Sequence, residues 1–285
     1  MTISPLILHI LKNKYSWIFF GFLINIFFSI IYAQSYINIS SNLNNKPLPF
    51  WHTSNQLGIY DKSPSIISES FKGKNNLFEY NFIVVLDPTD FSNFYIPIAS
   101  INNNNNNYQL KAGRWIDNLT NESILSTGSL LISKNALPIT KISLRTNEYK
   151  KFSIFNFQFS MKAGISHGWM SKERYVKAPL LHEKFLYINK DFKNQMTFRV
   201  GLVHEAMWGG ETEKHGQQSQ SLNDYLRVLT FSPGSKSSLI QEQINTLGNH
   251  LGVWDIVFTK IQKKLEFKLY YQHPFEDGSG AYQYF

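Results

Sequence analysis

The chain has 285 residues, a net charge of +8 and no cysteine, which excludes a disulfide framework and any thiolate metal site. Hydrophobic residues make up 43% and aromatic residues 15%, whereas charged residues make up only 17%. This balance favours β-strands, because aromatic and β-branched side chains pack well on a pleated surface. Lysine and arginine are dispersed along the chain. We therefore expect no nucleic-acid partner, since such proteins concentrate basic residues on one face.

The first 33 residues have the pattern of a secretory signal peptide. Lys12 and Lys14 precede an apolar stretch from Trp17 to Ile31, and Ala33 is followed by the polar Gln34. We expect cleavage after Ala33 and export to the bacterial cell envelope. The alternative is an N-terminal anchor helix that stays attached.

The remaining chain divides into two parts that differ in their pattern of polar and apolar residues. Residues 34–75 are polar and irregular, and we interpret them as a periplasmic N-terminal segment. Residues 76–285 contain short apolar or alternating runs and form the expected β-barrel region. No stretch after the signal approaches the roughly 20 apolar residues of a membrane-spanning helix. If the mature protein lies in a membrane, it must therefore do so as a closed barrel, because open sheet edges would leave backbone groups unpaired in lipid.

Candidate strands follow in chain order, separated by Gly, Pro, Asn and Ser. They are 77–86, 94–100, 108–115, 128–133, 139–146, 152–160, 162–169, 182–189, 196–205, 224–231, 251–261 and 264–272. A short helix is expected at 237–247, and a short turn at 261–263.

A period of two is clearest in two of these runs. Met196, Phe198, Val200 and Leu202 share one face of the first run, and the second alternates in the same way over 264–272. Runs of about nine residues match a tilted transmembrane strand, with apolar side chains toward lipid and polar ones toward the lumen. We predict an all-β fold, an antiparallel transmembrane β-barrel of the outer-membrane type. A soluble β-sandwich with one buried face per sheet is the alternative.

Residues that could carry chemistry give weak signals. The histidines lack the helical spacing of a zinc motif such as His-Glu-x-x-His, so we expect no metal site and no cofactor. Glu276 and Asp277 could be imagined as a glycosidase pair, but adjacent residues on a turn usually diverge, whereas such carboxylates face each other across a sugar. We predict no catalytic residue and no enzymatic activity.

Several segments together resemble the capsule assembly Wzi family, especially its Bacteroidetes-type members. They are 49–51 (PFW) with 55–58 (NQLG), 167–169 (HGW), 201–210 (GLVHEAMWGG), 224–225 (DY), 245–255 (NTLGNHLGVWD) and 271–280 (YQHPFEDGSG). The resemblance implies a monomeric barrel in outer-membrane lipid whose outer loops act as a lectin for capsular polysaccharide. Family members are longer and have more strands, so the chain is expected to be a truncated member with an incomplete barrel, or a shorter variant.

The family motif assigns no individual sugar contacts, so the predicted polysaccharide-binding residues are polar and aromatic side chains at expected loop ends. They are Trp169, His204, Trp208, Glu211, His250, Trp254, His273, Glu276 and Asp277. The tryptophans have a second interpretation as an aromatic girdle at the membrane surface. Three functions remain open at this point: a capsule-retaining lectin, a porin-type channel, and an envelope enzyme acting on glycans.

Overall fold

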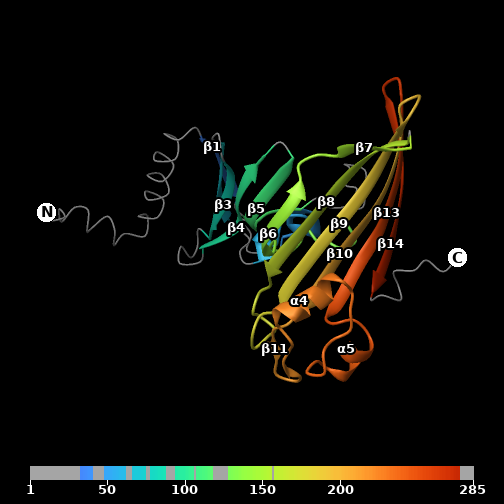
Figure 1. Cartoon of the computed structure of the whole chain (residues 1–285). Coiled ribbons are helices and arrows are strands. Elements are labelled where there is room, and N and C mark those ends of the chain that lie inside the picture. The colour runs from blue at the N-terminus through green and yellow to red at the C-terminus, as the bar shows by residue number, and fades with distance from the viewer. Residues whose placement is uncertain are drawn as a thin grey trace, which may run out of the picture. The chain divides into compact units, whose positions relative to one another are not determined.

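The computed structural model describes residues 33–40, 48–61, 66–74, 78–87, 94–105, 107–117, 128–155 and 157–276 (Figure 1). Antiparallel strands dominate these residues, and the helices are few and short. The prediction of an all-β antiparallel fold is confirmed. The chain divides into two compact units, which are described separately.

The first unit contains the chain up to Asn103 together with Gly113–Trp115 and Lys134–Pro138. Four strands pair in chain order, each antiparallel to the next: β1 (Ala33–Ser40), β2 (Ile66–Lys74), β3 (Glu79–Leu86) and β4 (Phe94–Asn104). The short helix α3 (Phe50–Thr53) and the 3-10 turn η1 (Ile59–Asp61) lie between β1 and β2. Residues 34–75, predicted to be irregular, therefore contain two strands. Their periplasmic location stays a prediction.

The second unit contains nearly all of the chain from Ile139 onward. Its sheet has the order β6-β8-β9-β10-β13-β14, and β7 also pairs with β8. The strands are β6 (Thr140–Thr146), β7 (Lys150–Ile154), β8 (Phe157–Trp169), β9 (Leu180–Phe192), β10 (Met196–Trp208), β13 (Asn249–Gln262) and β14 (Leu265–Glu276). Strand β5 (Tyr108–Arg114) has residues in both units.

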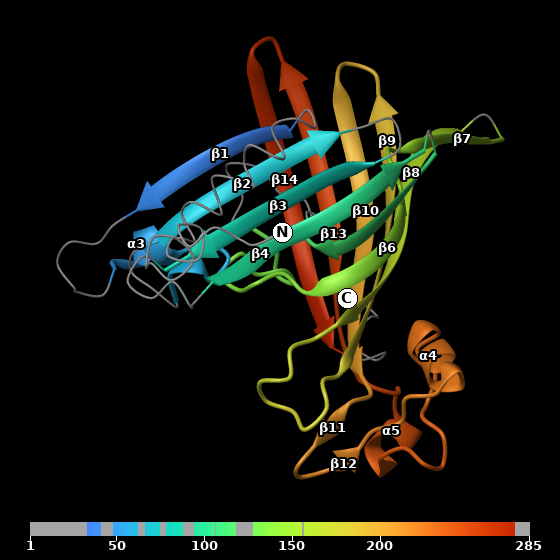
Figure 2. The same cartoon turned by 90° about the vertical axis from the view of Figure 1, so that its left-hand side faces the viewer.

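Connections in the second unit alternate between short and long. After a break at 147–149, β7 continues the pairing of β6 along β8, and short connections then join β7 to β8, β9 to β10 (193–195), and β13 to β14 (263–264). The connections at 170–179 and 209–248 are much longer, and the latter carries β11 (Glu211–Thr212), β12 (Gly216–Gln217), α4 (Leu222–Leu229) and α5 (Ile240–Ile244). Because the strands are antiparallel, the short connections gather at one end of the sheet, the turn end. The long connections gather at the other, the long-connection end (Figure 2).

The segment 224–231, predicted as a strand, is helix α4 instead. Ser221 caps it: the Ser221 hydroxyl accepts from Asp224 N at 3.2 Å, and the Asp224 carboxylate accepts from Ser221 N at 2.9 Å. Such a reciprocal box satisfies backbone N–H groups that a helix start leaves free. Apolar residues also recur here at helical spacing, with Leu222 and Leu226 four apart. The short helix expected within 237–247 is confirmed as α5.

Two other predicted strands are wrong. The segment 152–160 spans a hairpin instead of one strand, because the chain reverses after Phe155, which has a positive φ of 46°. The segment 128–133 has no strand, because the Ser129 hydroxyl accepts from Leu131 N and Ile132 N and folds it into a local turn. Leu131 and Ile132 then pack against buried side chains of β9, β10 and β13.

The second unit's sheet has two unlike faces, fixed by strand register. On β9, Tyr187 and Asn189 are 4% and 8% exposed, whereas Leu186 and Ile188 between them are 41% and 43% exposed. We call the side of Tyr187 and Asn189 the polar face and the other side the apolar face. Apolar-face side chains in register on other strands are exposed too; examples are Ile142, Leu144, Phe198, Phe258, Phe267, Leu269 and Tyr271.

The predicted signal peptide lies outside the described residues except for Ala33, which begins β1. Among the described residues, no helix has the length and apolar character needed to cross a bilayer. The incompleteness of the barrel stays a prediction.

Candidate functional site

The long-connection end of the second unit holds most of the predicted binding residues. Trp169 ends β8 and is 45% exposed, with its ring edge-on to His167 at a centroid distance of 5.1 Å. Trp208 ends β10 but is buried beside Tyr225 of α4. Glu211 begins β11, where its backbone exchanges hydrogen bonds with Lys177 of the β8–β9 connection.

His204 and His250 form a pair that water cannot reach. His204 Nε2 lies 2.9 Å from His250 Nδ1, and His250 Nε2 lies 2.9 Å from the Leu247 carbonyl oxygen. A carbonyl only accepts, so His250 Nε2 carries a proton and donates it to Leu247. Both rings are fully buried, and Phe231 covers them with centroid distances of 4.2 and 5.2 Å. A polymer cannot contact either histidine while Phe231 stays in place.

These rings anchor the connection that carries α4 and α5. His182, Ala206 and Trp208 project from the same face as His204, and Val228 and Leu247 of the connection are buried against Ala206 and Trp208. Lys184 donates to the carbonyl of Leu229 at the C-terminus of α4, where a cation is favourable. The sequence-predicted histidines thus hold the helices on the strand ends.

The other predicted residues do not join this cluster. Trp254 of β13 lies opposite His273 of β14 on the apolar face, and His273 stacks on Tyr271 with rings 16° from parallel. Glu276 ends β14 and is exposed. Asp277 lies outside the described residues. Within the described part of the chain, no three His, Asp or Glu side chains are grouped to hold a metal ion.

A buried charge network on the polar face escaped the sequence analysis. Lys141 Nζ lies 2.7 Å from Glu183 and 2.8 Å from Asp117, and Arg145 forms two hydrogen bonds of 2.7 and 2.9 Å to the Asp117 carboxylate. Ser166 donates to the other oxygen of Glu183. The alternation of Lys141, Ser143 and Arg145 with Ile142 and Leu144 along β6 was the signal that could have revealed it.

The network fixes the protonation of Asp117, which lies in the connection after β5. Burial alone raises the pKa of this carboxyl, but the hydrogen bonds and charges of Arg145 and Lys141 outweigh burial and hold the pKa well below its ordinary value. Asp117 therefore faces Lys141 and Arg145 as a carboxylate ion. Burying charges requires such pairing, because an isolated ion loses its hydration.

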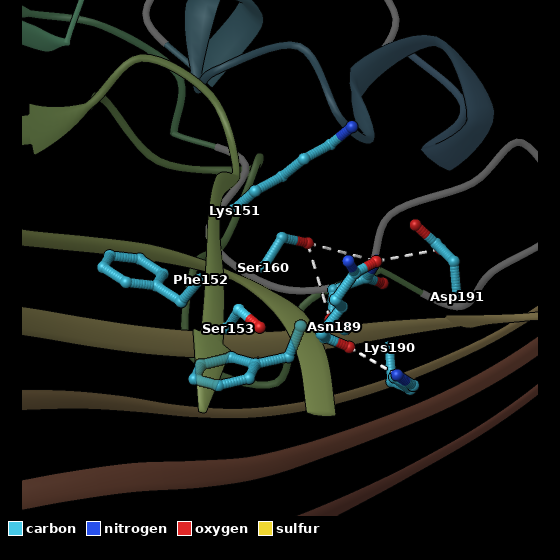
Figure 3. A pocket seen from close by; sticks show the side chains of 9 residues that line it. Lys151, Phe152, Ser153, Ser160, Asn189, Lys190 and Asp191 are labelled. Carbon is cyan, nitrogen blue, oxygen red and sulfur yellow. Dashed lines mark hydrogen bonds between the residues drawn. The ribbon is translucent and has the colours of Figure 1, made fainter. Parts of the chain in front are cut away.

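A cavity of about 460 Å³ lies at the turn end, among β7, β8 and β9 (Figure 3). Asn189 donates to Asp191 Oδ1 at 3.1 Å, and Asp191 also accepts from Thr197. Lys151 and Ser160 line the same hollow. None of the residues predicted to bind polysaccharide contributes to its wall.

The fold and the site do not by themselves identify the protein family, but a comparison with known families does. The family model described as "Capsule assembly protein Wzi" matches residues 51–284, which is most of the chain. The chain belongs to the Wzi capsule assembly family. This confirms the resemblance found in the sequence and gives the protein a role in capsule assembly. No curated protein and no solved structure matches the chain.

Proposed function

We propose that this Wzi family member is an outer-membrane protein that holds capsular polysaccharide at the cell surface without cutting or building it. The observation that carries the membrane part is the inversion of the two faces of the second unit's sheet. Exposed Leu186 and Ile188 alternate with buried Tyr187 and Asn189 on β9. A soluble sheet buries its apolar side chains, whereas a membrane barrel turns them toward lipid.

The alternation of tight turns and long connections supports an orientation. Outer-membrane barrels have short turns on the periplasmic side and longer loops outside the cell. The long-connection end, with α4, α5 and the 170–179 connection, would then be extracellular. Exposed Trp169 lies there beside Lys172, Glu173 and Arg174, which are exposed as well. An aromatic ring with mobile charged groups can stack on a sugar and bind its hydroxyl or acidic substituents.

Binding is favoured over the channel alternative by what covers the polar face. Leu131 and Ile132 pack against Phe185, Val203 and Val253 there. Asp117, on the same connection between β5 and β6, is held by Arg145. This connection thus occupies the face that would line an aqueous pore, so we expect little steady conductance in planar bilayers.

The test measures where the polymer goes. Deleting the gene should leave polymer synthesis intact but release polymer into the medium, and the wild-type gene should restore attachment. Trp169→Ala should release a large part of the polymer, because it removes the exposed ring at the long-connection end. Phe192→Ala is the matched control, since Phe192 is an exposed aromatic at the turn end of β9. Unchanged attachment in the deletion strain would overturn the proposal.

A further inference from the structure

The connection between β10 and β13 contains a helical insertion, defined here as residues 221–247, with a clear inner side. Val228 and Leu247 are buried against Ala206 and Trp208, and Tyr225 packs on the Trp208 ring with centroids 5.7 Å apart. The contacted residues of β10 belong to the apolar face. The insertion therefore lies on the same side of the sheet as the exposed apolar side chains of β9.

The outer side of the insertion is apolar and uncovered within the described chain. Leu222 and Leu226 of α4 are 76% and 49% exposed, and Ile240 and Ile244 of α5 are 75% and 81% exposed. Each pair is spaced four residues apart, which places its two members on one side of their helix. A helix that buries one side and exposes large aliphatic residues on another needs a second apolar environment.

The charged side chains of the insertion also differ in how far they are exposed. Its two acids accept backbone hydrogen bonds: Asp224 accepts from Ser221 N, and Glu242 accepts from Gly248 N. Of its two bases, Arg227 is partly buried and donates to the Pro233 carbonyl oxygen at 3.2 Å, whereas Lys236 is exposed. The one charged side chain of the insertion that is exposed is therefore the cation of Lys236, which complements lipid phosphate groups.

We propose that the helical insertion docks on an anionic lipid surface, with Leu222, Leu226, Ile240 and Ile244 buried at the headgroup boundary. The inference rests on the proposed membrane location and adds an interfacial anchor at the rim of the apolar face. Amphipathic helices that lie on membranes combine aliphatic and basic side chains in this way. The docked helices would keep the long-connection end, and with it Trp169, close to the lipid headgroups.

Because the chain has no cysteine, single cysteines can report the depth of chosen positions. Leu226→Cys and Ile244→Cys are labelled with a polarity-sensitive fluorophore, and the full chain is reconstituted in nanodiscs that contain anionic lipid. We expect a blue-shifted emission at both positions, with strong quenching by lipids that carry a nitroxide at the headgroup. Leu269→Cys, at an exposed position of the apolar face, should be quenched by a nitroxide on the acyl chain. Lys214→Cys, in the exposed β11–β12 hairpin, should report water.

The membrane depths measured at positions 226, 244 and 269 distinguish the docking of the insertion from the membrane location of the sheet. Water-like emission at positions 226 and 244 with quenching at position 269 overturns the docking and leaves the membrane location intact. Water-like emission at position 269 overturns the membrane location itself. Blue-shifted emission at 226 and 244 without lipid quenching identifies a protein cover, such as a second copy, and also overturns the docking. Lys236→Gln, which removes the exposed cation, should weaken headgroup quenching at 226 in anionic lipid.

Discussion

The two faces of the second unit's sheet are built from the same strands and solve opposite problems. The polar face buries Asp117, Lys141, Arg145 and Glu183 as paired ions, while the apolar face leaves residues such as Leu269 uncovered. Exposed apolar surface costs about 25 cal/mol for each Å² left in water. The contrast shows that this sheet buries charged side chains on one face and leaves large apolar ones exposed on the other, which is the reverse of a soluble sheet.

The largest expected effect comes from breaking the ionic side. Lys141→Met leaves Glu183 without its cation and removes one of the two cations of Asp117. Removing one partner of a buried ion pair typically costs about 3–5 kcal/mol, because the other charge stays buried. Urea unfolding of lipid-reconstituted protein measures the loss. Lys151→Met, at an exposed lysine, is the control and should change the free energy of unfolding by less than about 0.5 kcal/mol.

The apolar face gives the next largest effect and the sharpest contrast with a soluble sheet. Leu269 is 73% exposed, so Leu269→Arg would be nearly neutral if that side chain faced water. In lipid the same change should cost about 2–4 kcal/mol near the bilayer midplane. The free energy of unfolding in vesicles decides between the two environments, and a neutral result would contradict the membrane location.

Acid should selectively reduce the stability that the buried ions of the polar face provide. The effect should be smaller than that of the two substitutions above, because acid only adds protons to carboxylates. The pKa of Asp117 is lowered in the fold, so its contribution to stability is complete above the ordinary carboxyl range and declines as the pH falls below that range. Asp117→Asn should reduce stability at neutral pH and flatten this acid dependence. Unfolding midpoints measured across an acid series test the prediction, and parallel curves for both proteins would contradict it.

The smallest effect concerns how α4 is held against the apolar face. Ser221→Ala removes the hydroxyl that accepts from Asp224 N and should cost about 1 kcal/mol. Hydrogen exchange should accelerate in α4 while β9 and β10 stay protected. Ser237→Ala, at an exposed serine outside the helices, should leave the exchange of α4 unchanged. Equal protection of α4 in both variants would show that packing alone holds the helix.

The sequence predicted a strand well where its apolar and polar side chains alternate between the two faces of the sheet. In 196–205 the alternation of Phe198 and Val200 with Arg199 and Gly201 follows the two faces directly, and β10 forms there. The prediction of a strand at 224–231 was wrong because the spacing of its aliphatic residues fits both the period of two of a strand and the period of about 3.6 of a helix. Its decisive signal was the capping pair Ser221 and Asp224, a local contact that a count of apolar positions does not weigh.

The candidate site was less predictable, because burial depends on contacts distant in sequence. His204 and His250 have the polar character of binding residues, yet Phe231, from the connection between their strands, closes over both rings. Asp117 gave no sequence signal, since its partners Lys141 and Arg145 lie beyond a long connection. Only Trp169 among the predicted tryptophans combines a strand end with substantial exposure.

The position of Asp117 outside the strands ties the connection after β5 to the charge balance of the sheet. Without it, Lys141 and Arg145 would lose the carboxylate that both of them contact, and only Lys141 would keep an ion pair, to Glu183. An unbalanced charge in a low-dielectric interior is strongly unfavourable. The connection after β5 therefore supplies an anion from outside the strands, and the buried charges of the sheet are fully paired only while this connection is docked.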